Sequence, residues 1–375
     1  MPKVVLSVNT SWNVVNFRSG LIKALHSRGY EVSVVAPKDD HSAKVTDLGC
    51  RYIAIEMDNA GMSPFRDLHL AWSYWRIIRQ ERPNVFIGFT IKPNIFGSVS
   101  AYLNGVPVIN NISGLGTAFV RGGVLRKLVQ SMYRCALYRS KLVFFQNDDD
   151  RVLFVDEGIV REEQTLLLPG SGVNLDHFSP TVDEMPRLNG VVFILVARLL
   201  WDKGVGEFVE AARLVREKVP TARFQLLGFL DVENRTAVPR NRIEQWVDEG
   251  LVEFLGSTDD VRPFLQAADC VVLPSYREGT PRSLLEGGAM AKPLIATNVP
   301  GCKEVVDHAE NGFLCRPRDA EDLASKMIEF AAMDYPSRIS MGQKSRRKIE
   351  KKFSETIVIE KYLSAIQQII KATDS

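Results

Sequence analysis

Two glutamates with seven residues between them form the most informative pattern in this chain. Glu278 and Glu286 come soon after an apolar stretch, Cys270–Pro274. Thr280 is a favourable N-cap residue and Pro281 suits the first helical position, so a helix should begin here with Glu286 about two turns inside it. The free N–H groups at its start can bind an anion. Carboxylates on either side can bind hydroxyls at two ends of one ligand, and a sugar joined through a diphosphate to a ribose has this layout. The alternative is a capped helix with two solvated glutamates.

Two basic residues offer positive charge to the same kind of ligand. Arg198 and Lys203 follow the apolar stretch Val191–Ala197 and precede another helical pattern, so they should project from the end of a strand. Two cations beside a helix N-terminus can hold a diphosphate and stabilise the charge that grows on it as a bond breaks. The alternative is a surface loop whose cations are solvated.

Short apolar strands alternate with amphipathic helices along nearly the whole chain, which predicts an α/β fold with doubly wound parallel sheets. A turn-rich stretch from Pro169 to Asn189 predicts a linker between two halves. Two such halves facing each other would place a cleft at the carboxyl ends of their strands, where open α/β folds bind ligands. The predicted strands are Val4–Val8, Glu31–Ala36, Arg51–Glu56, Val85–Gly88, Pro107–Ile109, Leu142–Phe145, Leu166–Leu168, Val191–Ala197, Arg223–Gly228, Val252–Leu255, Cys270–Pro274, Pro293–Thr297 and Gly312–Cys315.

These residues together resemble the GT-B glycosyltransferases of family 4, in which two basic residues are followed some eighty residues later by the paired glutamates. The resemblance covers nearly the whole chain and is closest to members that assemble bacterial polysaccharides. Four further stretches carry it: Asn110–Gly116, Phe145–Asp148, Gly170–Val173 and Asn298–Gly301.

The resemblance implies two Rossmann-like domains that face a central cleft. Residues 1–170 would bind the acceptor, residues 171–352 would bind a UDP-sugar donor, and residues 353–375 would form a helix that crosses back to the first domain. The implied reaction moves a hexose or N-acetylhexosamine to a lipid-diphosphate-linked glycan and gives an α-linkage with retention. No cofactor and no metal ion are expected, because cationic side chains and a helix N-terminus already supply positive charge to the diphosphate.

The resemblance also assigns roles to individual residues. Arg198 and Lys203 would grip the diphosphate, Glu278 the donor sugar and Glu286 the ribose. Other donor-site residues would be Gly279, Thr280, Pro281, Arg282 and Ser283, with Gly256 and Asp260 beside the nucleobase. The acceptor side would comprise Asn9, Trp12, Arg18, Lys92, Asn111 and Ser113. The chain lacks the paired glycines that many relatives have in the first loop and the histidine that many have near the acceptor. Both departures concern the acceptor side.

A basic span without acidic residues lies between Ser113 and Gln146. Apolar residues interleave with its cations at helical spacing, which is typical of a helix on an anionic bilayer. The alternative is a helix that covers its own sheet and turns its cations outward. Trp72 and Trp75 are one helical turn apart and should pack in the core or against the membrane. The cations assigned to the membrane surface are Arg121, Arg126, Lys127, Arg134 and Arg139.

Composition limits the other possibilities. The chain has 45% hydrophobic and 25% charged residues, as in ordinary globular proteins, and a net charge of +2. We expect a cytoplasmic protein, peripheral on the inner face of the membrane, because no apolar run could span a bilayer or serve as a signal peptide. Five scattered cysteines and five scattered histidines give no metal-site spacing, and we expect no nucleic-acid partner. Two rival functions remain: a UDP-sugar 2-epimerase of the same fold and a non-catalytic sugar- or nucleotide-binding protein.

Overall fold

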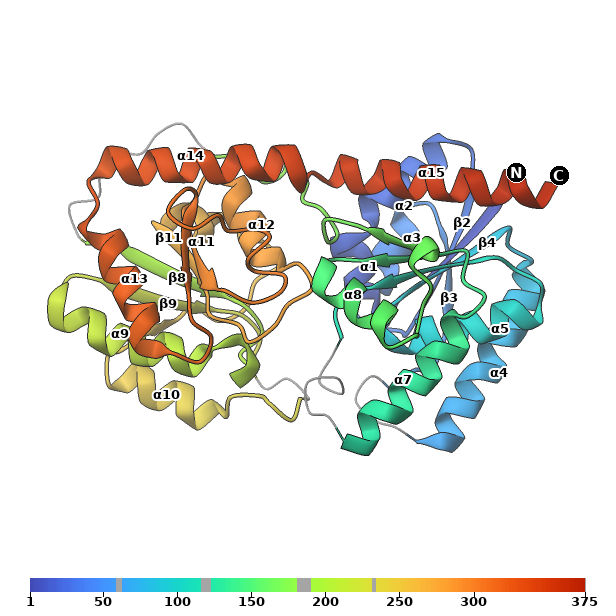
Figure 1. Ribbon diagram of the computed structural model, residues 1–375, viewed down its shortest axis with the longest axis horizontal. Coiled ribbons are helices and arrows are strands. Elements are labelled where there is room, and N and C mark those ends of the chain that lie inside the picture. Colours follow the sequence, from blue (N-terminus) through green and yellow to red (C-terminus); the bar gives the residue numbers. More distant parts are fainter. Residues whose placement is uncertain (59–62, 116–122, 181–189, 231–233, 375) are drawn as a thin grey trace. The chain divides into compact units, whose positions relative to one another are not determined.

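The computed structural model describes residues 1–58, 63–115, 123–180, 190–230 and 234–374. The chain forms two compact units (Figure 1). Unit 1 comprises Met1–Ser171 and Thr356–Ser375, and unit 2 comprises Gly172–Glu355. Among the helices in these described ranges, none is long and apolar enough to cross a membrane.

Unit 1 is built on a seven-stranded parallel sheet of order β3-β2-β1-β4-β5-β6-β7. Neighbouring strands align in register, so that Leu6 of β1 pairs with Val34 on one side and Ile87 on the other. The chain changes direction between β1 and β4, and ligands of such sheets bind at the carboxyl ends of strands at this point. The strands are β1 (Lys3–Ser7), β2 (Glu31–Ala36), β3 (Arg51–Ala54), β4 (Val85–Phe89), β5 (Val108–Ile112), β6 (Leu142–Phe145) and β7 (Thr165–Leu167).

Helices cover both faces of this sheet. On one face, α1, α2, α3 and α15 contribute apolar side chains to a single core, and α15 inserts Tyr362 and Ile366 there although it comes last in the chain. On the other face, α4 and α5 form one core cluster while α7 and α8 form another. The helices are α1 (Ser11–Phe17), α2 (Ser19–Ser27), α3 (Ser42–Asp47), α4 (Pro64–Glu81), the π-helix η1 (Pro93–Gly97), α5 (Ser98–Leu103), α7 (Gly123–Leu137), α8 (Asp148–Asp156), the 3-10 helix η2 (Glu162–Gln164) and α15 (Glu355–Asp374).

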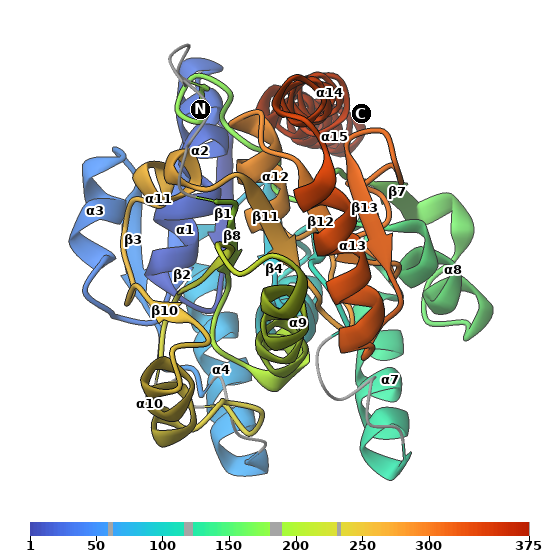
Figure 2. The ribbon, with the colours of Figure 1, turned by 90° about the vertical axis from the view of Figure 1, so that its left-hand side faces the viewer.

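Unit 2 repeats the design with a six-stranded parallel sheet of order β10-β9-β8-β11-β12-β13, and its switch point lies between β8 and β11. Helices α9 and α13 lie side by side on one face (Figures 1 and 2), while α11, α12 and α14 cover the other. The elements are β8 (Val192–Val196), η3 (Trp201–Lys203), α9 (Val205–Lys218), β9 (Arg223–Leu227), α10 (Arg240–Asp248), β10 (Glu253–Phe254), α11 (Arg262–Ala267), β11 (Cys270–Leu273), α12 (Arg282–Ala289), β12 (Leu294–Thr297), β13 (Gly312–Cys315), α13 (Ala320–Ala332) and α14 (Tyr335–Lys352).

The predicted doubly wound α/β class is confirmed, and the strand boundaries differ mostly by one or two residues. The largest difference is β5, which continues through Asn110 and Asn111 where we predicted its end at Ile109. Both asparagines are fully buried. The Asn110 amide donates to Asn94 Oδ1 at 2.9 Å and to Ser98 Oγ at 2.8 Å, so hydrogen bonds compensate for the burial of a polar group in the strand.

Candidate functional site

The two glutamates lie on the loop and helix that follow β11, as predicted, but the helix begins one residue late. Pro281, with φ −72° and ψ 118°, occupies the N-cap position, and no side chain caps the helix there. The prediction of Thr280 as N-cap is therefore wrong, because the extended ψ of Pro281 delays helical geometry until Arg282. Gly279, Thr280 and Pro281 belong to the loop that carries Glu278, and Arg282 and Ser283 open α12.

Lys203 and Glu278 form an ion pair within unit 2. Their side chains are only 21% and 12% exposed, so the pair is held close to the protein surface and is largely shielded from solvent. Two hydrogen bonds to the Asp202 carbonyl hold together the segments that carry Lys203 and Glu278. Ser275 Oγ donates to this oxygen at 3.1 Å, and the Tyr276 amide donates to it at 3.0 Å. The two motifs that lie far apart in sequence thus meet at the carboxyl ends of adjacent strands, β8 and β11.

Two glycines allow the backbone segments of this site to approach closely. Gly204 follows the turn that bears Lys203 and has φ +73°, and a Cβ atom there would lie 2.1 Å from the Pro274 carbonyl oxygen. Gly301 has φ +87°, and its Cβ would lie 2.6 Å from the carbonyl oxygen of Glu278. Only glycine tolerates both the left-handed dihedrals and these contacts.

Glu286 is held by Arg282 one turn earlier on α12. The Arg282 Nε donates to Glu286 Oε1 at 2.7 Å, and its Nη1 donates to the Gly172 carbonyl at 2.5 Å. Burial raises the pKa of the Glu286 carboxyl, while the charge and hydrogen bond of Arg282 oppose that rise. Arg282 therefore orients the carboxylate and leaves lone pairs on it for a ligand hydroxyl.

Arg198 lies exposed just beyond β8. Within the described part of the chain, its side chain makes no ion pair, so its charge is available to an anion. Gly256 and Asp260 follow β10, two strands away from β8. Asp260 is engaged by Arg262 at 2.8 Å, and this hydrogen bond is the main reason that the pKa of Asp260 lies below its ordinary value.

The predicted acceptor-side residues belong to unit 1 and gather at the carboxyl edge of its sheet. Asn9 and Trp12 follow β1, Lys92 follows β4, and Ser113 follows β5. The Lys92 ammonium is paired with Asp67 at 2.7 Å and both side chains are mostly buried, so this cation is already partly neutralised.

Arg18 and Asn111 are buried beneath this edge. Arg18 is 4% exposed and its guanidinium lies 4.1 Å from the ring centroid of Phe89 at the end of β4. The Asn111 amide donates to Tyr362 Oη at 2.6 Å. Among the described residues, neither Asn111 Oδ1 nor Ser113 Oγ has a hydrogen-bond partner although both atoms are buried. Buried polar atoms without partners are costly. A ligand hydroxyl could donate to Asn111 Oδ1, and the Ser113 hydroxyl could donate to a ligand hydroxyl or phosphate oxygen.

Sequence reasoning missed Tyr362 of α15. Burial raises its pKa to about 12 despite the opposing charge of Arg18, so the phenol stays neutral and hydrogen-bonded to Asn111. It lies 251 residues from its partner, and neither motif nor spacing connects the two.

Of the cations assigned to the membrane surface, some bind other parts of the protein and others are exposed. Arg126 pairs with Glu157 at the end of α8, and Arg134 donates to the Glu157 and Gly158 carbonyls at 2.7 and 3.0 Å. These two arginines therefore join α7 to the segment that follows α8. Lys127 and Arg139 are exposed, and Arg121 lies outside the described residues.

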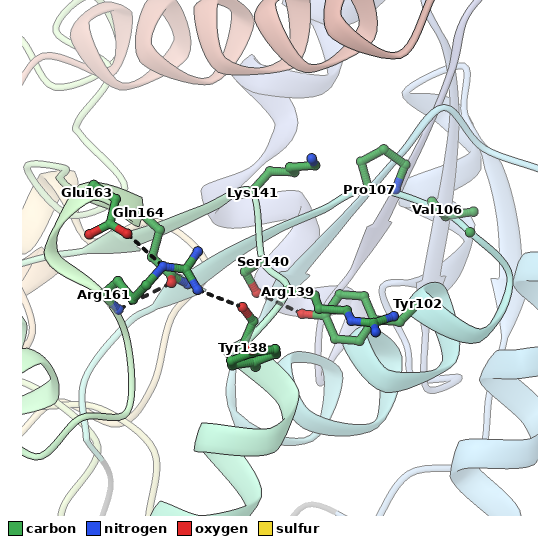
Figure 3. A pocket seen from close by; sticks show the side chains of 11 residues that line it. Tyr102, Val106, Pro107, Tyr138, Arg139, Ser140, Lys141, Arg161, Glu163 and Gln164 are labelled. Atoms are coloured by element: carbon green, nitrogen blue, oxygen red, sulfur yellow. Dashed lines mark hydrogen bonds and ion pairs between the residues drawn. The ribbon is translucent and has the colours of Figure 1, made fainter.

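A pocket of about 550 Å³ opens at the amino ends of β5 and β6, the opposite edge of the sheet from the predicted acceptor residues (Figure 3). Arg139, Lys141 and Arg161 contribute to its lining. Arg161 is already bound to Glu163 at 2.7 Å and to the Tyr138 carbonyl at 3.3 Å. Of the predicted site residues that the structure describes, only Arg139 lines this pocket. In the part of the chain that the structure describes, no group of three or more His, Cys, Asp or Glu residues could hold a metal ion.

Both halves of the chain match models of known protein families. Residues 190–332 match the family model described as glycosyl transferases group 1, and residues 3–147 match that described as glycosyl transferase 4-like. The chain is 29% identical over 374 residues to N,N'-diacetylbacillosaminyl-diphospho-undecaprenol alpha-1,3-N-acetylgalactosaminyltransferase of Campylobacter jejuni, with 96% of each chain covered.

Two further proteins extend the comparison. The chain is 24% identical to UDP-Gal:alpha-D-GlcNAc-diphosphoundecaprenol alpha-1,3-galactosyltransferase of Escherichia coli, with 81% of each chain covered. Its fold is similar to that of Anabaena HepE, solved in complex with UDP and glucose, with a TM-score of 0.79, 18% identity and full coverage of both chains.

Proposed function

The chain belongs to the family 4-like glycosyltransferases of the GT-B fold, and from this premise we propose that it transfers a hexose or N-acetylhexosamine from a UDP-sugar to a lipid-diphosphate-linked glycan, with retention and an α-linkage. The observation that carries the proposal is the Lys203–Glu278 pair at the β8/β11 switch point, with exposed Arg198 just beyond β8. It combines positive charge for a diphosphate with a carboxylate for sugar hydroxyls.

In the proposed reaction, the acceptor hydroxyl oxygen bonds to the anomeric carbon while the bond from that carbon to the β-phosphate oxygen breaks. The acceptor proton passes to the leaving phosphate on the same face, so no protein nucleophile is required. Arg198 and Lys203 stabilise the charge that develops on the diphosphate. Glu278 binds the donor sugar, and Glu286, oriented by Arg282, binds the ribose.

The printed names of two relatives support the choice of substrates. The E. coli relative uses UDP-Gal, and both it and the C. jejuni relative act on sugars carried on a diphosphate-linked undecaprenol. In unit 1, the buried oxygens of Asn111 and Ser113 are the acceptor contacts that we propose. A lipid-linked acceptor places the enzyme on the inner face of the cytoplasmic membrane as a peripheral protein, where exposed Lys127 and Arg139 face anionic lipid.

The decisive experiment incubates the protein with a panel of UDP-sugars, with and without an undecaprenyl-diphosphate-linked glycan. UDP release that requires the acceptor identifies a transferase, whereas an isomerised UDP-sugar identifies an epimerase. Binding of the UDP-sugar without turnover identifies a binding protein. The same assay in EDTA should keep its rate, and loss of activity that magnesium or manganese restores would contradict the metal-free proposal.

A further inference from the structure

Helix α4 turns an apolar surface outward. Leu70, Tyr74 and Ile78 form its buried face and pack into the core of unit 1. On the opposite face, the residues Phe65, Leu68 and Trp72 are 86%, 69% and 52% exposed.

The exposed side chains of α4 form one continuous stripe. At about 100° per residue, Phe65, Leu68 and Trp72 share one face of the helix with two exposed arginines, Arg76 and Arg79. We call these five residues the α4 stripe. Its first half is apolar and its second half is basic, and the Arg76 guanidinium lies 5.6 Å from the Trp72 ring centroid.

Helix α4 lies within the described residues, and it has no acidic side chain that is both exposed and unpaired. The helix contains two acidic residues. Asp67 is paired with Lys92, and Glu81 is buried and paired with Lys3 and Arg51. The stripe therefore presents apolar and positive groups together, which is the composition that suits an anionic lipid surface.

Helix α7 lies in a separate core cluster from α4 and has a similar outward character. The N-terminal ends of α4 and α7 project from the same end of unit 1 (Figures 1 and 2). On α7, Leu128 is 49% exposed and Lys127 is exposed, and the helix contains no acidic residue. Two helices with the same outward character thus share one end of the unit.

We propose that the α4 stripe docks on the surface of an anionic phospholipid bilayer. Phe65, Leu68 and Trp72 enter the boundary between headgroups and acyl chains, and Arg76 and Arg79 reach the lipid phosphates. The inference rests on the proposed function, because a lipid-linked acceptor requires the enzyme to reach a membrane. It places the apolar part of the membrane contact on α4, outside the basic span between Ser113 and Gln146.

A second copy of the chain fits this surface less well. Even if each of the three apolar side chains offered the roughly 250 Å² of a large aromatic group, the apolar part of the stripe would fall short of the ~800 Å² that each partner contributes to a specific dimer, and the two arginines would have to supply the rest. Its arginines would also face each other across a two-fold interface without an acidic partner.

The test is co-sedimentation with phosphatidylglycerol/phosphatidylcholine vesicles. The triple variant Phe65→Gln, Leu68→Gln, Trp72→Gln should partition at least tenfold less than the parent. The matched control, Leu103→Gln, Val247→Gln, Ile339→Gln, changes three exposed apolar residues elsewhere and should bind like the parent. The single variant Phe65→Gln should show a smaller loss in the same direction, and it provides the test if the triple variant fails to fold.

A second measurement tests whether the Trp72 side chain enters the bilayer. Brominated lipids should quench tryptophan fluorescence in the parent and quench it less in Trp72→Phe. Vesicle binding by the stripe variants that equals the parent's would overturn the proposal, as would dimerisation that requires the stripe but occurs without vesicle binding. Parent and triple variant should release UDP equally with a water-soluble acceptor analogue. Failure of both to turn over any acceptor would contradict the proposed function, while vesicle binding still tests the stripe.

Discussion

Glu278 and Glu286 differ in their surroundings, and we expect their loss to have different kinetic effects. Glu278 is paired with Lys203 beside the diphosphate site, whereas Glu286 is set on α12 and oriented by Arg282. Glu286→Ala should mainly raise KM for the UDP-sugar, and Glu278→Ala should also lower kcat because it removes a contact to the reacting sugar. Steady-state kinetics with Glu310→Ala, an exposed carboxylate on unit 2, provides the control. Wild-type kinetics in both variants would refute the donor-site assignment.

The two basic residues should affect turnover more than binding. Arg198→Ala and Lys203→Ala should each lower kcat by roughly a hundredfold, the usual effect of removing a group that stabilises developing charge. Arg213→Ala on α9 removes an exposed arginine and should leave kcat unchanged. If the double variant Arg198→Ala, Lys203→Ala keeps full activity, both side chains are ordinary surface cations.

The raised pKa of Glu286 predicts a pH dependence of donor binding. Burial raises this pKa above the ordinary value of 4.5, so the carboxyl takes up its proton at a higher pH than a solvated glutamate as the solution is acidified. Protonation removes an acceptor for the ribose hydroxyls, and KM for the donor should rise as the pH falls. Measured KM–pH profiles should lose this component in Glu286→Gln. An unchanged profile in that variant would assign the pH dependence to another group.

At the scale of elements, the turn after Lys203 should not tolerate a side chain. Gly204→Ala must accept the left-handed dihedral, which costs roughly 1–2 kcal/mol, and also a contact of 2.1 Å with the Pro274 carbonyl. Gly250→Ala is a matched control, because Gly250 has φ +69° but nothing within 4 Å of its Cβ position. Chemical denaturation should show a larger loss for Gly204→Ala. Equal losses would mean that the backbone there relaxes without cost.

Sequence patterns predicted most elements well because burial on both faces leaves a strong apolar signal in each strand. They predicted less well where polar groups are satisfied inside the fold. Asn110 and Asn111 continue β5 because their amides are hydrogen-bonded. Arg126 and Arg134 bind the end of α8, whereas we had assigned their charges to the membrane surface. The sequence likewise did not predict that apolar residues of α4 are exposed, because their exposure depends on which helices pack nearby.

The whole molecule brings together residues that no local pattern relates. The Lys203–Glu278 pair joins positions 75 residues apart because β8 and β11 are adjacent in the sheet, and the family resemblance had already assigned both residues to the donor site. The contact of Tyr362 with Asn111 spans 251 residues and depends on where α15 packs. The donor-side residues could therefore be proposed from sequence, whereas the support of the acceptor side required coordinates.

The last helix should contribute strongly to the stability of unit 1. Ile366 is fully buried in the core that α15 shares with α1, α2 and α3, so Ile366→Ala should cost about 2–5 kcal/mol. Ile339→Ala on α14 removes an isoleucine that is 41% exposed and should cost much less. Thermal unfolding with limited proteolysis would locate the loss. Equal effects of the two substitutions would show that α15 is not an integral part of unit 1.

The position of α15 in the chain has a consequence for synthesis on the ribosome. Unit 1 needs Tyr362 and Ile366 to complete its core, yet all of Gly172–Glu355 is translated between Ser171 and this helix. At ~5–20 residues per second, the first 171 residues would be complete roughly 10–40 s before α15 is synthesised. During this time the apolar surface that α15 covers would be exposed to solvent. The nascent chain should therefore carry a hydrophobic groove that ribosome-associated chaperones can occupy, and its closure would come only after unit 2 has emerged.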